Sequence, residues 1–186
     1  MQAPRECHLQ STLRILEYVK VAPGKGLIFQ KNGHLRVKAY SDASYADDKG
    51  DHKSTSSFCT FVGGNLVSWK SKKQYVVSRC SAEAEYRSMT STTCELKWLR
   101  ALMMDLGEVY NYPLPMFCDN KAAIYISKNP VFHERTKHIE VDCHFIREEI
   151  LRNKFALPSS LLIKSWLTSS PSQYPPCFFI FATSWA

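Results

Sequence analysis

The chain has 186 residues and carries 24 Lys and Arg against 17 Asp and Glu, which gives a formal net charge of +7. Hydrophobic residues make up 45% of the chain and charged residues 22%, a balance that excludes a wholly disordered protein. No apolar run approaches the roughly 20 residues of a membrane-spanning helix and the first residues lack the apolar core of a signal peptide, so we expect no membrane or secreted protein.

The first part of the chain predicts one helix followed by antiparallel strands. Apolar residues at helical spacing predict a helix over residues 9–19, which ends before Pro23. Alternating residues predict a strand over residues 35–40. A second strand over residues 57–62 and its return strand over residues 66–70 are joined by a glycine-rich hairpin turn.

The middle of the chain predicts a crossover to a parallel strand. A long helix is predicted over residues 81–106, then a short strand over 114–118. Asn120 is expected to cap a helix over residues 122–127, and another helix is expected over residues 139–150. This order predicts a mixed α/β domain whose first three strands are antiparallel and whose fourth strand is parallel.

Three acids stand at positions where a site can form. Asp42 follows the first strand, Glu85 lies in the first turns of the long helix, and Asp119 follows the fourth strand. Strand ends and helix starts are where α/β folds gather ligands. Three carboxylates brought together repel one another unless a cation binds, and Mg²⁺ prefers oxygen ligands. Taken singly, each Asp is more simply a turn former or a helix cap.

Several ordered motifs carry a resemblance to a known family. They are YSDASYA (residues 40–46), KSTS (53–56), VSWKSKKQ (67–74), SAEAEY (81–86), CDNKAA (118–123) and NPVFHERTKHI (129–139). Together they resemble the ribonuclease H domain of copia-type LTR retrotransposon Pol polyproteins. The resemblance implies a C-terminal fragment of such a polyprotein, with a ribonuclease H-like domain over residues 35–152. Residues 1–34 resemble a remnant of the connection that follows reverse transcriptase.

The resemblance also implies an activity. Asp42, Glu85 and Asp119 would be catalytic, metal-binding acids holding two Mg²⁺ ions, with Mn²⁺ as an alternative. Glu83 is the rival of Glu85 on the helix. The reaction would be hydrolysis of the RNA strand of an RNA–DNA hybrid, with one ion activating water and the other stabilising the leaving oxygen. Reverse transcriptase would be a partner in the parent polyprotein.

Basic residues suggest where a nucleic acid would bind, since the positive net charge favours a polyanionic partner. One segment contains Trp69, Lys70, Lys72 and Lys73, and it either follows phosphates or is a solvated strand end. A second cluster of Arg135, Lys137 and His138 either contacts substrate or forms a surface loop. Asn120 is also assigned to substrate.

The end of the chain departs from the family. Family domains continue with another strand and close with a Leu-Ala-Asp motif, whose Asp supplies a fourth acid. Read one nucleotide earlier, residues 166–172 allow that motif, and residues 155–159 allow Ile-Cys-Thr-Pro-Phe. We hypothesise a frameshift near residues 153–154, which would make residues 153–186 an aberrant, disordered tail, remove the last strand and helix, and impair the nuclease. The alternative is a lineage-specific tail.

Two other functions stay open at this point. The chain would be a non-catalytic nucleic-acid-binding or pseudogene-derived domain if the acids do not work. An integrase or transposase core also uses clustered acids, but those enzymes place their Glu after the second Asp. Seven scattered cysteines without zinc-finger spacing indicate a reducing compartment, so we expect a cytoplasmic or nuclear protein of a retroelement particle.

Overall fold

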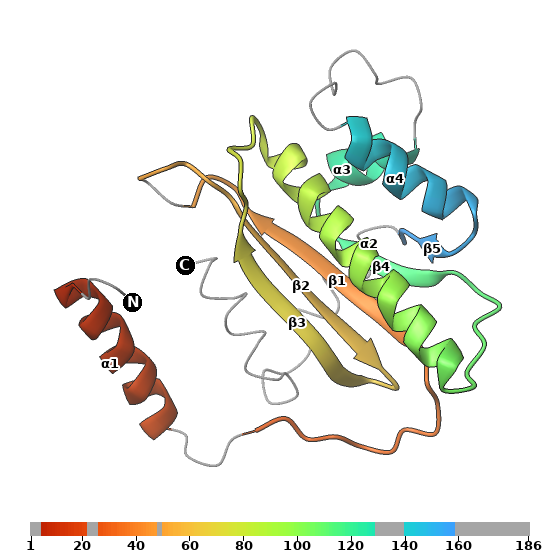
Figure 1. Ribbon diagram of the computed structural model, residues 1–186, viewed down its shortest axis with the longest axis horizontal. Helices are drawn as coiled ribbons and strands as arrows, with labels where there is room; N and C mark the ends of the chain where they lie inside the picture. Colours follow the sequence, from red (N-terminus) through yellow and green to blue (C-terminus); the bar gives the residue numbers. More distant parts are fainter. Residues whose placement is uncertain (1–4, 22–25, 48–49, 129–139, 159–186) are drawn as a thin grey trace.

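The computed structural model describes residues 5–21, 26–47, 50–128 and 140–158, which form four helices and five strands (Figure 1). The helices are α1 (Glu6–Val21), α2 (Ser81–Asp105), α3 (Lys121–Lys128) and α4 (Glu140–Leu151). The strands are β1 (Val37–Ser44), β2 (Thr55–Val62), β3 (Asn65–Lys73), β4 (Leu114–Cys118) and β5 (Phe155–Ala156).

The five strands form one mixed sheet in the order β3-β2-β1-β4-β5. Strands β1, β2 and β3 pair antiparallel, β4 is parallel to β1, and β5 is parallel to β4. The predicted antiparallel start and parallel fourth strand are therefore confirmed. Because β1 and β4 run in the same direction, their carboxyl ends lie at the same edge of the sheet.

Two strands are longer than their sequence patterns predict. β1 continues two residues beyond Asp42, so this acid lies within the strand and not at its end. β3 continues to Lys73. These extensions consist of polar residues, so an apolar pattern does not predict them. Pairing with β2 keeps both strands extended, because Thr55 pairs with Ser44 of β1 and with Lys73 of β3.

The last strand corrects an expectation. We predicted that it was lost with the tail, yet Phe155 and Ala156 form β5 beside Leu114 and Pro115. Phe155 is 3% exposed and Leu157 is 7% exposed, so alternate apolar side chains fill the core even in a sequence that departs from the family. The described fold thus continues to residue 158, whereas the predicted loss of the closing helix concerns residues 159–186, which lie outside the described residues.

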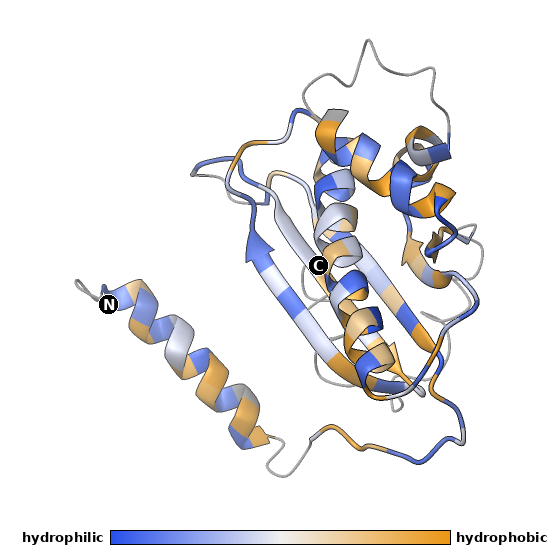
Figure 2. Cartoon of the chain, turned by 45° about the vertical axis from the view of Figure 1, so that its right-hand side comes forward, coloured by the Kyte–Doolittle hydropathy of each residue, from blue (hydrophilic) through white to orange (hydrophobic). Residues whose placement is uncertain are grey.

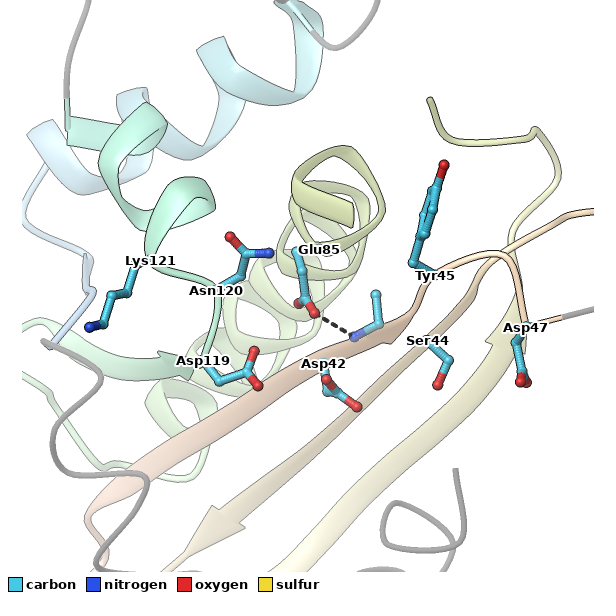
Figure 3. A pocket seen from close by; sticks show the side chains of 9 residues that line it. Asp42, Ser44, Tyr45, Asp47, Glu85, Asp119, Asn120 and Lys121 are labelled. Atoms are coloured by element: carbon cyan, nitrogen blue, oxygen red, sulfur yellow. Dashed lines mark hydrogen bonds between the residues drawn. The ribbon is translucent and has the colours of Figure 1, made fainter. Parts of the chain in front are cut away.

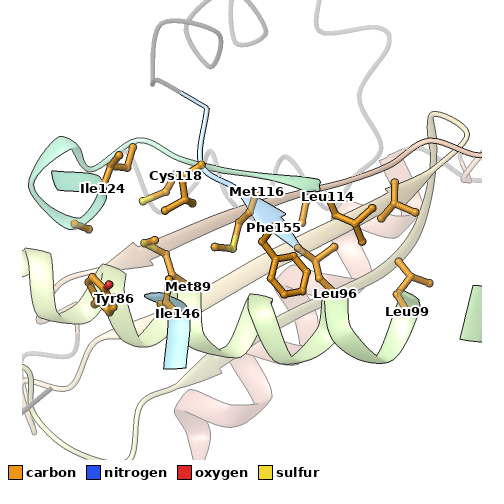
Figure 4. Close-up of a cluster of buried hydrophobic side chains, with 14 of the residues drawn as sticks. Tyr86, Met89, Leu96, Leu99, Leu114, Met116, Cys118, Ile124, Ile146 and Phe155 are labelled. Atoms are coloured by element: carbon orange, nitrogen blue, oxygen red, sulfur yellow. The ribbon is translucent and has the colours of Figure 1, made fainter. Parts of the chain in front are cut away.

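The main core lies between the sheet and its three covering helices. Helix α2 crosses β1, β2 and β4 and presents Tyr86, Met89, Leu96 and Leu99 to them (Figure 4). Spacings of three and seven residues place these side chains on one helix face. The core also takes buried side chains from β4, β5, α3 and α4, so α2, α3 and α4 all cover the same face of the sheet.

Helix α1 lies apart from the sheet and carries several exposed apolar residues, among them Leu9 and Leu16 (Figure 2). The segment that follows is held on the β2–β3 hairpin, because Gln30 exchanges two backbone–amide hydrogen bonds of 2.8 Å with Asn65. Among the described helices, none combines the length and apolar character needed to cross a membrane.

Candidate active site

A pocket of about 650 Å³ opens at the edge of the sheet where β1 and β4 end and α2 and α3 begin (Figure 3). The residues that line it are Asp42, Ala43, Ser44, Tyr45, Asp47, Glu85, Asp119, Asn120 and Lys121. The structure therefore brings Asp42, Glu85 and Asp119 to one pocket from three separate segments. Parallel pairing of β1 with β4 places the two aspartates at this edge, and packing of α2 on β1 adds the glutamate.

Glu85 is the most buried of these acids, with only 5% of its surface exposed. Its Oε1 accepts a hydrogen bond of 3.2 Å from the backbone N–H of Ala43. Burial, followed by the nearby charges of Asp42 and Asp119, raises the pKa of Glu85 from 4.5 to about 8. Burial also raises the pKa of Asp119. The pocket thus concentrates negative charge, which a bound cation would relieve.

Cys118 is a residue of this site that we did not predict. Its thiol donates a hydrogen bond of 3.7 Å to Oε2 of Glu85, and burial raises the pKa of the thiol above its ordinary value. One ligand atom each from Glu85, Cys118 and Asp119 lies within 4.8 Å of the others. The protonated thiol serves as a hydrogen-bond donor, so the donors offered to a metal ion are carboxylate oxygens. Such a donor set fits Mg²⁺ or Mn²⁺.

Of the residues predicted to contact substrate, one lines the pocket and others lie on β3. Asn120 lines the pocket, and its Oδ1 accepts a hydrogen bond of 3.0 Å from the N–H of Ala123, which confirms the predicted helix cap. Trp69 is 53% exposed on β3. Since side chains alternate along a strand, Trp69 and Lys73 lie on one face of the sheet, and Lys70 and Lys72 on the other.

Some of these lysines already have partners in the structure. Lys73 pairs with Asp51 at 3.1 Å, and Lys72 donates a hydrogen bond of 2.6 Å to the hydroxyl of Tyr75. Arg135, Lys137 and His138 lie outside the described residues, as residues 129–139 do as a whole.

Two further acids matter for a fourth ligand. Asp47 lines the pocket, and no sequence motif predicted it because it stands in a polar turn after β1. Asp142 does not line the pocket. It lies on α4, where burial raises its pKa and the charge of Arg87 and a hydrogen bond with Thr90 lower it.

Comparisons with known proteins agree with the resemblance. The chain is 45% identical to the retrovirus-related Pol polyprotein from transposon RE1 of Arabidopsis thaliana, over 150 residues. It is 42% identical to the corresponding polyprotein from transposon RE2 of the same plant and 35% identical to that from transposon TNT 1-94 of Nicotiana tabacum. Each match covers 81% of this chain and 10 or 11% of the relative. No protein-family model matches.

Similar solved structures are ribonuclease H domains. LC11-RNase H1 in complex with an RNA/DNA hybrid aligns with a TM-score of 0.45 and 13% identity, over 66% of this chain and 85% of that one. The chain spans about a tenth of the length of the polyproteins it matches. Over the matched stretch, the chain is similar to copia-type, retrovirus-related Pol polyproteins.

Proposed function

We propose that this domain is a Mg²⁺-dependent endonuclease that hydrolyses the RNA strand of RNA–DNA hybrids, with activity impaired in this chain. The observation that carries the proposal is the meeting of Asp42, Glu85 and Asp119 in one pocket. Burial, followed by repulsion from Asp42 and Asp119, raises the pKa of Glu85 and so makes it hard to ionise without a cation. A pocket built this way is suited to divalent ions and to a phosphodiester.

In this proposal each acid has a defined task. Asp42, Glu85 and Asp119 hold the cation through their carboxylate oxygens, and Mn²⁺ can replace Mg²⁺ because it accepts the same ligands. The Ala43 N–H and the Cys118 thiol orient the Glu85 carboxylate by their hydrogen bonds. Two bound ions would supply an activated water and neutralise the charge that develops on the leaving oxygen.

The substrate assignment rests on charge and on aromatic exposure. The formal net charge of +7 favours a polyanion, and Trp69 and Lys73 lie on the sheet face that also carries Asp42. The 2′-hydroxyl is the group by which the RNA strand differs from DNA. Lys70, Lys72, Asn120, Arg135, Lys137 and His138 remain predicted substrate contacts. Reverse transcriptase of the parent polyprotein, in a cytoplasmic or nuclear retroelement particle, remains the predicted partner.

Impairment follows because the described part of the chain offers no fourth acid close to Asp119. Asp47 is the one other acid that lines the pocket among the described residues, and Figure 3 places it well away from Asp119. One metal would therefore be weakly held. If a frameshift removed the family's Asp, the DNA that encodes residues 150–186 should encode Leu-Ala-Asp when translated in the shifted frame. A DNA sequence without that motif in the shifted frame would rule out the frameshift.

A labelled hybrid tests the proposal directly. We expect slow cleavage of the RNA strand in the presence of Mg²⁺. A chelator should abolish this cleavage, and so should Asp42→Asn. Asp105→Asn is the matched control, because Asp105 is exposed at the end of α2, and it should cleave like the parent chain. Cleavage that survives Asp42→Asn would contradict the proposal.

A non-catalytic nucleic-acid-binding or pseudogene-derived domain is the second candidate, and it is favoured because no fourth acid lies near Asp119 in the pocket among the described residues. It predicts hybrid binding with no cleavage by either the parent chain or the variant. An integrase or transposase core is a third, weaker candidate. The position of Glu85 between Asp42 and Asp119 along the chain argues against it.

A further inference from the structure

A fully buried serine of α2 lies directly behind the candidate active site. Ser88 is 0% exposed and stands three residues after Glu85, so the two side chains lie on the same side of the helix. The hydroxyl of Ser88 donates a hydrogen bond of 2.7 Å to the backbone carbonyl oxygen of Asp42. This hydroxyl does not line the pocket and holds no cation, so its contact with Asp42 has a different purpose.

The direction of this hydrogen bond is unusual for a helix. A buried hydroxyl inside a helix commonly bonds the carbonyl oxygen four residues earlier. Thr92 and Thr93 of α2 do so, each at 2.8 Å, to the carbonyls of Ser88 and Met89. The Ser88 hydroxyl instead leaves its own helix and reaches β1. Ser41 of β1 donates a hydrogen bond of 3.1 Å to the Ser88 oxygen, so the proton of Ser88 is left for a backbone carbonyl.

Two side chains from this part of α2 hold the two ends of one peptide group. The carbonyl of Asp42 and the N–H of Ala43 belong to the same planar unit. Ser88 donates to its carbonyl oxygen, and Oε1 of Glu85 accepts a hydrogen bond of 3.2 Å from its N–H (Figure 3). The backbone that carries the Asp42 carboxylate is therefore fixed directly against the helix that carries the Glu85 carboxylate.

The sheet supports this peptide group from one side. The pairing of β1 with β4 ends at Ser41, opposite Cys118, so the Asp42–Ala43 peptide lies beyond the end of β4. On the other side, β2 continues and pairs Ser57 with Asp42. The pocket opens where β4 has ended. Hydrogen bonds from α2 thus add support to β1 at the point where one neighbouring strand no longer provides it.

We propose that Ser88 is a positioning residue of the metal site, which sets the position of the Asp42 carboxylate relative to Glu85 by holding the Asp42–Ala43 peptide. The inference rests on the proposed function and concerns the same site. Mg²⁺ requires near-ideal geometry with ligands at about 2.0–2.1 Å, so a small displacement of one carboxylate weakens binding. Groups that orient a metal ligand without touching the ion contribute roughly 10- to 100-fold in metal affinity.

Calorimetric titration of the full chain with Mn²⁺ tests this role. Ser88→Ala should weaken Mn²⁺ binding by about tenfold relative to the parent chain. Thr93→Val is the matched control, because it removes another buried hydroxyl of α2 that bonds only within the helix and to Met116, and it should bind like the parent. Ser88→Cys keeps the side-chain volume but offers only a weak donor, so the same loss is expected if the alanine variant does not fold. Parental affinity in the folded Ser88 variants would overturn the proposal.

Amide hydrogen exchange, followed by NMR in a chelator, gives a readout that needs no metal. In the Ser88 variants, the Ala43 N–H should exchange at least about tenfold faster than in the parent chain, because the peptide is released at one end. The Ala39 N–H, earlier in β1, should keep its parental rate. An unchanged rate at Ala43, or an equal rise at both amides, would overturn the positioning role of Ser88. A parent chain that binds no Mn²⁺ would instead overturn the proposed metal site, so the two failures are distinguishable.

Discussion

Glu83 and Glu85 stand two positions apart on α2 and serve different parts of the molecule. Two residues correspond to about 200° around a helix, so the side chains point in nearly opposite directions. Glu83 accepts a hydrogen bond of 2.8 Å from the backbone N–H of Arg79 and pairs with Arg87 at 2.9 Å. Glu85 faces Asp42 and Asp119 in the pocket. Glu83 therefore stabilises the start of α2, and Glu85 is left for the site.

This difference predicts opposite effects of the same substitution. Glu83→Gln should lower the free energy of unfolding by roughly 1–3 kcal/mol, because it replaces a buried, hydrogen-bonded carboxylate by a neutral amide and takes the charged partner from Arg87. Glu85→Gln should raise stability in the absence of metal, because it removes a buried charge that Asp42 and Asp119 repel. Urea unfolding in a chelator measures both. Equal destabilisation by the two variants would mean that Glu85 is a structural residue.

The raised pKa of Glu85 predicts a pH dependence of stability. Its pKa is about 8 in the folded chain against an ordinary value of 4.5, so between these values the folded state binds more protons than the unfolded state. The free energy of unfolding of the metal-free chain should therefore fall as the pH rises through this window, by a few kcal/mol at most. Below about pH 4.5 this contribution is fully present.

Unfolding at about pH 5 and about pH 8, in a chelator, checks this dependence. Glu85→Gln should flatten it, and saturating Mg²⁺ should restore stability at the higher pH to the parent chain but not to the variant. A parent chain whose stability rises between these two pH values, relative to the variant, would refute the assignment of a buried, repelled carboxylate.

The short strand β5 should contribute measurably to stability. Phe155→Ala should lower the free energy of unfolding by about 3 kcal/mol, because the ring is buried in the main core. Leu151→Ala is the control, since Leu151 is 85% exposed at the end of α4, and it should change stability by less than about 0.5 kcal/mol. If both substitutions have the same small effect, β5 does not belong to the folded domain.

Trp69 should contribute to hybrid binding. An exposed aromatic ring against a nucleic acid is worth roughly 1–3 kcal/mol, so Trp69→Ala should weaken binding by about tenfold. Trp98→Ala replaces an equally exposed ring on α2 and should leave affinity unchanged. Fluorescence anisotropy with a labelled hybrid measures both, at two salt concentrations because phosphate contacts are salt-sensitive. Equal losses for both variants would remove Trp69 from the substrate interface.

The sequence predicted the fold where local pattern and long-range pairing agree. The hairpin of β2 and β3, the long helix α2 and the strand β4 all have apolar periodicity, and apart from the longer β3 the structure has them close to their predicted bounds. The prediction that the last strand is lost was wrong, because we judged residues 155–157 by their departure from the family. Burial of Phe155 and Leu157 depends only on apolar side chains at alternate positions.

The site was predictable in part for a similar reason. Asp42, Glu85 and Asp119 were named from motifs, and the structure gathers them at one pocket. Cys118 and Asp47 were missed, since their contributions depend on the neighbour each side chain meets. Cys118 points into the core like Met116, two residues before it, and its thiol lies beside Glu85. No local sequence pattern shows that contact with a distant helix. Roles in catalysis stay predictions for all of them.

The most direct test of the central claim is calorimetric titration of the full chain with Mn²⁺, which reports cation binding whether or not the chain cleaves RNA. The account predicts saturable binding to the parent chain and to Glu83→Gln, and loss of that binding in Asp42→Asn and Glu85→Gln. Unchanged Mn²⁺ binding in both site variants, with the fold intact, would contradict it.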